Sequence, residues 1–270
     1  ADNNTFIGSR TGSANTSGSS NTAIGKYALK ATTTGSRNIG IGTNALDAAT
    51  TTSDNIAIGY DALGATLDGG AFNIAIGNYA GDSIDTGSYS VLMGHNAGNA
   101  ITGSQGIVAI GYEALKNNWA TGNTAVGMQA GVNGTGANNT YMGYNAGYTG
   151  TSTYSVYMGI SAGMYAASDN SVAIGANSGR NITGDYNVAL GAVSLNAATS
   201  AEKNTAIGSN ALDSLSQGDK NTALGYKSGD AISTGSSNIV IGHEAGDNIS
   251  TGSSNVVIGK ADVTHDANDQ

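Results

Sequence analysis

The sequence predicts an all-β fold, a parallel β-solenoid of about sixteen rungs with 16 to 18 residues in each rung. Three observations predict it: a repeat that fills the chain, a β-branched residue at one fixed position of every repeat, and a composition with 42 Gly but no Pro or Cys. Such a repeat is typical of stacked structures, because one unit cannot bury its apolar side without neighbours. The glycine content and an apolar period of two residues both disfavour helix.

The repeat is clearest in Ser236–Lys260, where SSNIVIGHEAGDNISTGSSNVVIGK states nearly the same motif twice, 17 residues apart. Its anchor is the glycine of NIVIG. The anchor recurs at Gly8, Gly25, Gly42, Gly59, Gly77, Gly94, Gly111, Gly127, Gly143, Gly159, Gly175, Gly191, Gly208, Gly225, Gly242 and Gly259. Because no break marks a linker, we predict a single elongated domain over residues 1–259 and a tail, or the start of a following segment, over residues 260–270.

A short strand is expected just before each anchor glycine. The residue three places before the glycine is Thr, Ile or Val in all sixteen repeats, and the residue one place before it is always Ile, Val, Leu or Met. β-Branched residues favour strands, and positions two apart share one face of a strand. We expect this face to point into the core of the chain.

The residue between these two positions is expected on the opposite face, and it is never charged. It is Ala in nine repeats and Gly40, Val240, Val257, Leu92, Phe6, Tyr141 or Tyr157 in the others. A strand that is apolar on both faces is buried on both, so we predict that this column contacts further copies of the chain. The interface residues predicted in this way are Ala23, Ala57, Ala75, Ala109, Ala125, Ala173, Ala189, Ala206, Ala223, Tyr141 and Tyr157.

The rest of the repeat is expected to close the turn. Many repeats carry an apolar residue before a Thr-Gly or Ser-Gly pair, as in DSIDTGS, which suggests a second short strand and a tight turn at the glycine. Asn stands before the β-branched position in twelve repeats and predicts a column of stacked, hydrogen-bonded amides. This ladder is expected at Asn21, Asn38, Asn55, Asn73, Asn204, Asn221, Asn238 and Asn255.

Charge and hydropathy exclude several partners. The net charge is −9 and the ten Lys and Arg residues are scattered, so no nucleic-acid partner is expected. No apolar run approaches the roughly 20 residues of a membrane span, and no signal peptide is visible.

No catalytic, metal or cofactor site is expected either. His95 and His243 are nine repeats apart and His265 lies in the tail, so no His-Asp-Ser arrangement can form. The motifs for calcium in solenoids and for phosphate in glycine-rich loops are absent. Carboxylate pairs that could hydrolyse a glycan are Asp54 with Asp61 and Asp68, or Asp82 with Asp85, but they lack an aromatic setting and are common turn residues.

Aromatic residues indicate a binding surface in the seventh to tenth repeats. Aromatic rings stack on sugars or insert into protein partners while a polar tip forms hydrogen bonds. The candidates at variable turn positions are Tyr112, Trp119, Tyr144, Tyr148 and Tyr154.

The segment DNSVAIGANSG, Asp169–Gly179, resembles the head repeat of trimeric autotransporter adhesins of the YadA type, and the recurring NTAIGxxAL resembles repeats of bacteriophage tail-fibre proteins. The resemblance covers the whole array and implies a left-handed parallel β-roll, with three chains around one axis, exposed on a virion or bacterial surface and used for attachment. In this chain the period is slightly longer, and Asn usually stands one place nearer the glycine than in NSVAIG. The end of the array is similar to the point where phage arrays meet a following domain, so we expect the chain to continue.

The function expected from sequence is a structural and adhesive module of an extracellular fibre. It is expected to be a homotrimer, without enzymatic activity or cofactor, that presents a receptor-binding surface to a host-cell glycan or protein. Two alternatives remain open, a polysaccharide-degrading tailspike enzyme and an ice-binding solenoid. An ice-binding solenoid needs a regular Thr array, and the Thr column before the turn glycine skips repeats; it comprises Thr34, Thr86, Thr102, Thr121, Thr135, Thr183, Thr234 and Thr251.

Overall fold

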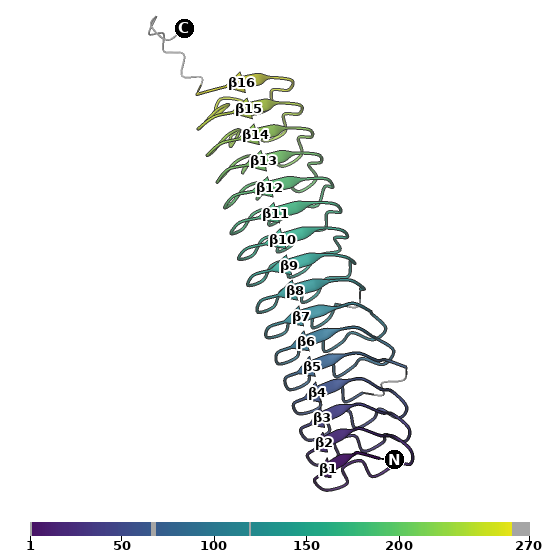
Figure 1. The fold of residues 1–270 in the computed structure, drawn as a ribbon. Coiled ribbons are helices and arrows are strands. Elements are labelled where there is room, and N and C mark those ends of the chain that lie inside the picture. Colours follow the sequence, from purple (N-terminus) through teal and green to yellow (C-terminus); the bar gives the residue numbers. More distant parts are fainter. Residues whose placement is uncertain (1, 66–68, 119, 261–270) are drawn as a thin grey trace, which may run out of the picture. The chain divides into compact units, whose positions relative to one another are not determined.

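The computed structural model describes residues 2–65, 69–118 and 120–260. It is an all-β parallel solenoid of sixteen three-residue strands, which follow one another in the sheet in sequence order (Figure 1). The strands are β1 (Thr5–Ile7), β2 (Thr22–Ile24), β3 (Ile39–Ile41), β4 (Ile56–Ile58), β5 (Ile74–Ile76), β6 (Val91–Met93), β7 (Val108–Ile110), β8 (Thr124–Val126), β9 (Thr140–Met142), β10 (Val156–Met158), β11 (Val172–Ile174), β12 (Val188–Leu190), β13 (Thr205–Ile207), β14 (Thr222–Leu224), β15 (Ile239–Ile241) and β16 (Val256–Ile258). Each strand lies at the triplet before an anchor glycine, so the predicted solenoid of repeated rungs is confirmed.

The chain divides into two compact units. The first unit, residues 1–153, contains β1–β9, and the second unit, residues 154–270, contains β10–β16. Within each unit, equivalent residues of successive strands lie side by side, as Ala173 does with Ala189.

The hydrogen-bond ladder continues beyond the strands. The backbone N–H of Tyr27 donates to the carbonyl of Ser9 at 3.0 Å, and that of Leu29 donates to the carbonyl of Ala45 at 3.0 Å. These bonds join the turns of neighbouring rungs in the same way as the strands are joined. The main chain of each rung therefore satisfies its polar groups on its neighbours.

The strands face the opposite way from the sequence prediction. The middle residue of nearly every strand is buried inside its own chain, whereas the flanking residues are half-buried or exposed. The eleven residues predicted at a subunit interface are therefore core residues, each at most 1% exposed: Ala23, Ala57, Ala75, Ala109, Ala125, Ala173, Ala189, Ala206, Ala223, Tyr141 and Tyr157. The physical reason is the narrow interior, which accepts one side chain from each strand and leaves the two flanking side chains outside.

In each rung, only some of the positions that point into this interior carry a large side chain. Where the middle strand residue is Ala57, the residue four places after the anchor glycine is the fully buried Leu63. Where the middle residue is Leu92, that later position is Gly98, and a Cβ there would lie 2.7 Å from Leu92 Cδ2. The two positions share one space, so a large residue at one requires a small residue at the other.

The predicted second strand is absent from the described residues. Ile84, the apolar residue of DSIDTGS, is fully buried, but it follows a turn directly and lies in no strand. Gly81 and Tyr89 have positive φ and bend the chain on either side of Ile84, so only a short segment between them could extend as a strand.

The anchor position requires glycine for two reasons, its backbone conformation and the close approach of the next rung. Gly25 has a φ of +131°, and a Cβ on it would lie 2.6 Å from the carbonyl oxygen of Gly42 in the next rung. Side chains rarely adopt this φ, and no side chain fits so close to backbone.

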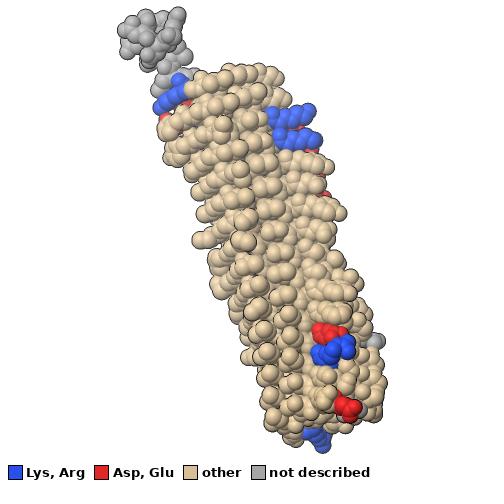
Figure 2. Space-filling view, viewed as in Figure 1, with Lys and Arg blue, Asp and Glu red and all other residues tan. Residues whose placement is uncertain are grey.

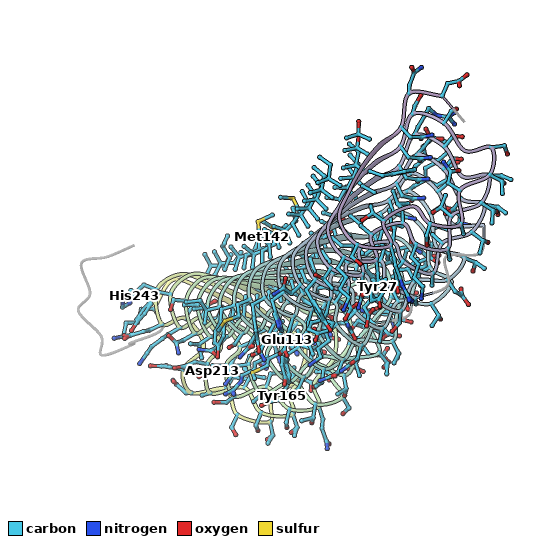
Figure 3. The ribbon with its side chains drawn as sticks, turned by 90° about the horizontal axis from the view of Figure 1, so that it is seen from below. Tyr27, Glu113, Met142, Tyr165, Asp213 and His243 are labelled. Carbon is cyan, nitrogen blue, oxygen red and sulfur yellow. The ribbon has the colours of Figure 1, made fainter. Side chains whose placement is uncertain are left out.

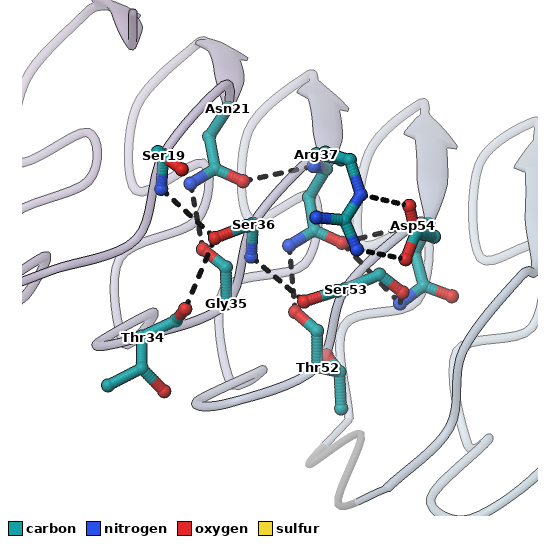
Figure 4. Close-up of polar contacts among 11 residues, drawn as sticks. Ser19, Asn21, Thr34, Gly35, Ser36, Arg37, Thr52, Ser53 and Asp54 are labelled. Atoms are coloured by element: carbon teal, nitrogen blue, oxygen red, sulfur yellow. Dashed lines mark hydrogen bonds and ion pairs between the residues drawn. The ribbon is translucent and has the colours of Figure 1, made fainter. Parts of the chain in front are cut away.

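The Asn residues form a buried ladder before the strands (Figure 4). The side-chain Nδ2 of Asn21 donates to the carbonyl of Gly35 at 2.8 Å, while its Oδ1 accepts from the backbone N–H of Asn38 at 2.9 Å. The Oδ1-to-N–H bond recurs up the column. The residues predicted for this ladder, Asn21, Asn38, Asn55, Asn73, Asn204, Asn221, Asn238 and Asn255, all take part.

Candidate functional site

The first candidate surface is formed by the first and third residues of every strand, which we call the outer strand face. Within each unit these positions hold only Thr, Ile, Val, Leu and Met. Several are well exposed, including Met93 at 39% and Met142 at 41% in the first unit and Leu224 at 44% in the second. Met142 points away from the ribbon on the side opposite Tyr27 and Glu113 (Figure 3). A continuous exposed face without charge is typical of a surface that binds a macromolecule.

The second candidate surface lies on the turns that follow the anchor glycines of β4–β7. The rings of Tyr60, Tyr79, His95 and Tyr112, which we call the aromatic ladder, pack one on the next. Their centroids are 5.3, 6.0 and 5.6 Å apart in that order, and the last pair is stacked. Tyr60 is 42% exposed and Tyr112 is 47% exposed, so the ladder keeps part of its aromatic surface open to solvent. In the second unit, Tyr226 and His243 form a similar pair at 5.2 Å.

Two carboxylates adjoin the aromatic ladder. Asp61 accepts a hydrogen bond from the hydroxyl of Tyr60 and raises the pKa of that tyrosine. Glu113 is bound by Lys116 at 2.8 Å and by the amide of Gln129 at 2.9 Å, and these contacts hold the pKa of Glu113 below its usual value. The ladder is therefore lined with fixed acceptors that are able to bind hydroxyl groups.

A third feature is a basic cluster on the first two rungs, which we call the Tyr27 cluster. The charged groups of Arg10, Lys26 and Lys30 lie 5.9, 4.8 and 5.1 Å from the centre of the Tyr27 ring. Lys and Arg atoms are sparse on the face drawn in Figure 2 and one group lies at the β1–β2 end of the first unit. Cations over an aromatic face are attracted by its quadrupole, which offsets part of their mutual repulsion.

The structure brings together only some of the predicted binding residues. Tyr112 belongs to the aromatic ladder, and Tyr144 stands at the same turn position two rungs later, 43% exposed. Tyr148 is half-buried at a different turn position, and Tyr154 is 64% exposed in the second unit. Trp119 lies outside the described residues.

Sequence reasoning missed most of the aromatic ladder and a second exposed pair, Phe72 and Tyr89. The rings of this pair are stacked 5.3 Å apart with an interplanar angle of 5°. An alignment of the repeats on the anchor glycine contains the signal, because Tyr60, His95 and Tyr112 all follow that glycine directly.

Two of the carboxylates considered for catalysis interact with other groups in the structure. Arg37 binds both oxygens of Asp54, at 2.6 and 2.7 Å, and holds the pKa of Asp54 below its usual value, whereas a general acid needs a raised pKa. The negative charge of Asp61 affects Asp82 instead. The pKa of Asp82 is raised first by burial and then by the charges of Asp61 and Asp47. Asp85 is exposed, and Asp68, like His265, lies outside the described residues.

Within the part of the chain that the structure describes, no three His, Asp or Glu side chains are arranged to hold a metal ion. None of the described residues forms a helix long and apolar enough to cross a membrane. The chain matches no protein-family profile and no curated protein sequence.

Proposed function

We propose that the chain is the structural and adhesive module of a surface fibre whose copies associate through the outer strand face. The observation that carries the proposal is the composition of this face: within each unit, every rung places two uncharged, mostly apolar side chains outside the core. A polar face is expected where a solenoid sheet meets only water. A second copy of the chain, which carries the same face, is the occupant that matches it over its full length.

The magnitudes favour association. Full burial of one Ile, Val, Leu or Met side chain stabilises by roughly 1.5 to 3 kcal/mol. Association costs roughly 4 to 15 kcal/mol in lost freedom of motion. Each unit offers two such side chains per rung. Burial of only part of the outer strand face therefore contributes more stabilising free energy than association costs.

The resemblance of the repeats to YadA-type heads and tail-fibre proteins supports the remaining details. We take the array to be a left-handed β-roll, the assembly to be a trimer, and its place to be a virion tail fibre or the outer surface of a bacterium. Three identical copies would present each receptor site three times and so increase avidity. In the first unit, Tyr27 and Glu113 lie away from Met142 (Figure 3), so the Tyr27 cluster and the aromatic ladder remain accessible when the outer strand face is covered.

The test is the molar mass in solution, measured by light scattering after gel filtration. A matched pair of variants makes it specific: Met142→Lys places a charge on the outer strand face, and Met128→Lys places the same charge on a turn where the native Met is 47% exposed, against 41% for Met142. We expect a mass of three chains for the parent and for Met128→Lys, and a lower mass for Met142→Lys. A mass of one chain for the parent, or equal masses for both variants, would overturn the proposal.

One alternative keeps an observation in its favour. The outer strand face repeats in register and carries Thr at Thr5, Thr22, Thr124 and Thr140, so a chain that stays monomeric would expose a regular face that suits ice. Thermal hysteresis of the purified chain measures that activity directly. Release of sugars from a polysaccharide would instead support a degrading enzyme.

A further inference from the structure

We propose that the Tyr27 cluster binds the carboxylate or sulfate group of an acidic saccharide. The inference rests on the adhesive function proposed above and adds the chemical class of the ligand. Three cationic side chains from two neighbouring rungs, Arg10, Lys26 and Lys30, converge on one ring. Such a convergence costs Coulomb energy unless an anion occupies it.

The arrangement stands out from the rest of the first unit. Of its five Lys and Arg residues, Arg37 is ion-paired with Asp54 and Lys116 with Glu113. The other three are those at Tyr27, and among the described residues no carboxylate forms an ion pair with them. Among the described residues of this unit, the Lys and Arg side chains without an ion pair are thus gathered at one place, in a chain whose net charge is −9.

One carboxylate lies near enough to act on the cluster. Asp47, on the next rung, is the carboxylate that interacts with Lys30. Burial and the neighbouring Asp61 raise the pKa of Asp47, and Lys30 offsets this only in part. Among the described residues Asp47 forms no ion pair with Lys30, whose ammonium group lies over the Tyr27 ring and stays open to a ligand.

The backbone holds the ring in place. Tyr27 has a φ of +64°, and its N–H donates to the carbonyl of Ser9 at 3.0 Å. The ring in turn orients the Lys26 ammonium group at 4.8 Å and the Lys30 ammonium group at 5.1 Å, which reduces the entropy lost when an anion binds. Arg10 adds a planar guanidinium that can bind a carboxylate or sulfate through two hydrogen bonds.

The surroundings favour a saccharide over a nucleic acid. The same turn column continues with the neutral Thr43 and Asn44 and then with Tyr60 of the aromatic ladder. A polyphosphate would need a basic groove along its length, whereas a saccharide with separated acidic groups needs one basic site and neighbours that bind hydroxyl groups and rings.

The probes are a galacturonic acid oligomer, its neutral methyl ester, a sulfated chondroitin oligosaccharide and a single-stranded oligonucleotide, titrated into the purified full chain by calorimetry. We expect the two acidic saccharides to bind, with an affinity that falls as salt rises, and the methyl ester not to bind. The variant Lys26→Gln/Lys30→Gln should bind them at least about tenfold more weakly, since it loses two charge-assisted hydrogen bonds. The matched control Lys220→Gln/Lys227→Gln removes two cations of the second unit and should bind as the parent does.

Three results would overturn the inference: no binding of either acidic saccharide, equal binding by the Lys26/Lys30 variant, or tighter binding of the oligonucleotide than of the saccharides. Circular dichroism of the variants checks that they fold, which is expected because both lysines are exposed. The molar-mass experiment is independent of this site. A protein that is a trimer but binds no acidic saccharide would therefore contradict this inference and leave the proposed function standing.

Discussion

The ring of Tyr157 occupies the space that a side chain at position 163 would need. A Cβ on Gly163 would lie 2.6 Å from Tyr157 Cδ1, and the ring is only 1% exposed. Two rungs later in the same unit the sizes are reversed, with Ala189 on the strand and Leu195 on the turn, both fully buried. In these rungs a large side chain at one position therefore goes with a small residue at the other.

This relationship predicts a coupling between the two sites. Tyr157→Ala alone leaves a cavity and should lower the free energy of unfolding by about 3 to 5 kcal/mol. Gly163→Leu alone overfills the core against the ring and should cost about 1 to 3 kcal/mol or more. The double variant recreates the Ala189–Leu195 arrangement, so we expect it to lose at least about 2 kcal/mol less than the sum of the single variants. Denaturant unfolding of the four proteins measures the coupling, and additive losses would contradict a shared space.

The anchor glycine should not tolerate even a methyl group. Gly25→Ala would place a Cβ 2.6 Å from the carbonyl oxygen of Gly42 at a φ of +131°, and we expect a loss of about 3 kcal/mol or more. The control is Gly103→Ala, where the new Cβ meets only Thr86 Oγ1 at 3.4 Å and no positive φ opposes it. Thermal unfolding followed by circular dichroism compares them, and similar melting temperatures for the two variants would refute the steric argument.

The Asn ladder should accept serine better than alanine. Asn38→Ala removes the acceptor of the Asn55 N–H and the donor to the Thr52 carbonyl, which leaves buried polar groups unsatisfied at a cost of roughly 2 to 4 kcal/mol. Asn38→Ser keeps an acceptor, as Ser171 does for the N–H of Asn187 at 3.0 Å, so about half of the loss should be recovered. The readout is the unfolding free energy. Equal losses would show that the side-chain oxygen is not the stabilising group.

The position of every strand could be predicted from sequence, but its orientation could not be read from the strand alone. A three-residue strand with apolar residues at all positions can turn either face toward the core. The bulkier flanking residues suggested that they point inward, and this orientation is wrong. The decisive signal lies outside the strand. Ala57 occurs with Leu63 and Leu92 with Gly98, and this exchange of size is expected only if both positions fill one interior.

The candidate surfaces were predictable to a smaller extent. The aromatic residues of the ladder are visible in the sequence, yet their contacts depend on which turn positions lie in one column, and Tyr79 reaches the column from the neighbouring position. The Tyr27 cluster joins Arg10 of one rung to Lys26 and Lys30 of the next, so residues 20 apart in sequence meet at one ring. Scattered basic residues in a linear sequence give no indication of this convergence.

The second unit should become more stable as the pH falls moderately. Asp213, Asp230 and Asp247 occupy one turn position on three successive rungs. Burial is the largest cause that raises the pKa of Asp230. Lys227 opposes it, and the negative charges of Asp247, Asp213 and Glu244 raise the pKa further. A carboxyl whose folded pKa exceeds its unfolded value of about 3.9 destabilises the fold when ionised, so stability is lost as the pH rises through the folded value and regained below it.

The effect on the free energy of unfolding should stay below about 1 kcal/mol, because the carboxyl is partly solvated. Asp230→Asn removes the ionisable group and should raise the melting temperature at pH 7, and it should flatten the change in stability as the pH falls toward the unfolded pKa of about 3.9. The change Asp54→Asn, made in the first unit, is the opposite control. Arg37 holds the pKa of Asp54 low, so this variant should lose stability at pH 7, and that loss should fade only as the solution becomes more acidic than the unfolded pKa. A parent protein and an Asp230→Asn variant with the same dependence on pH would show that repulsion along this column does not affect the fold.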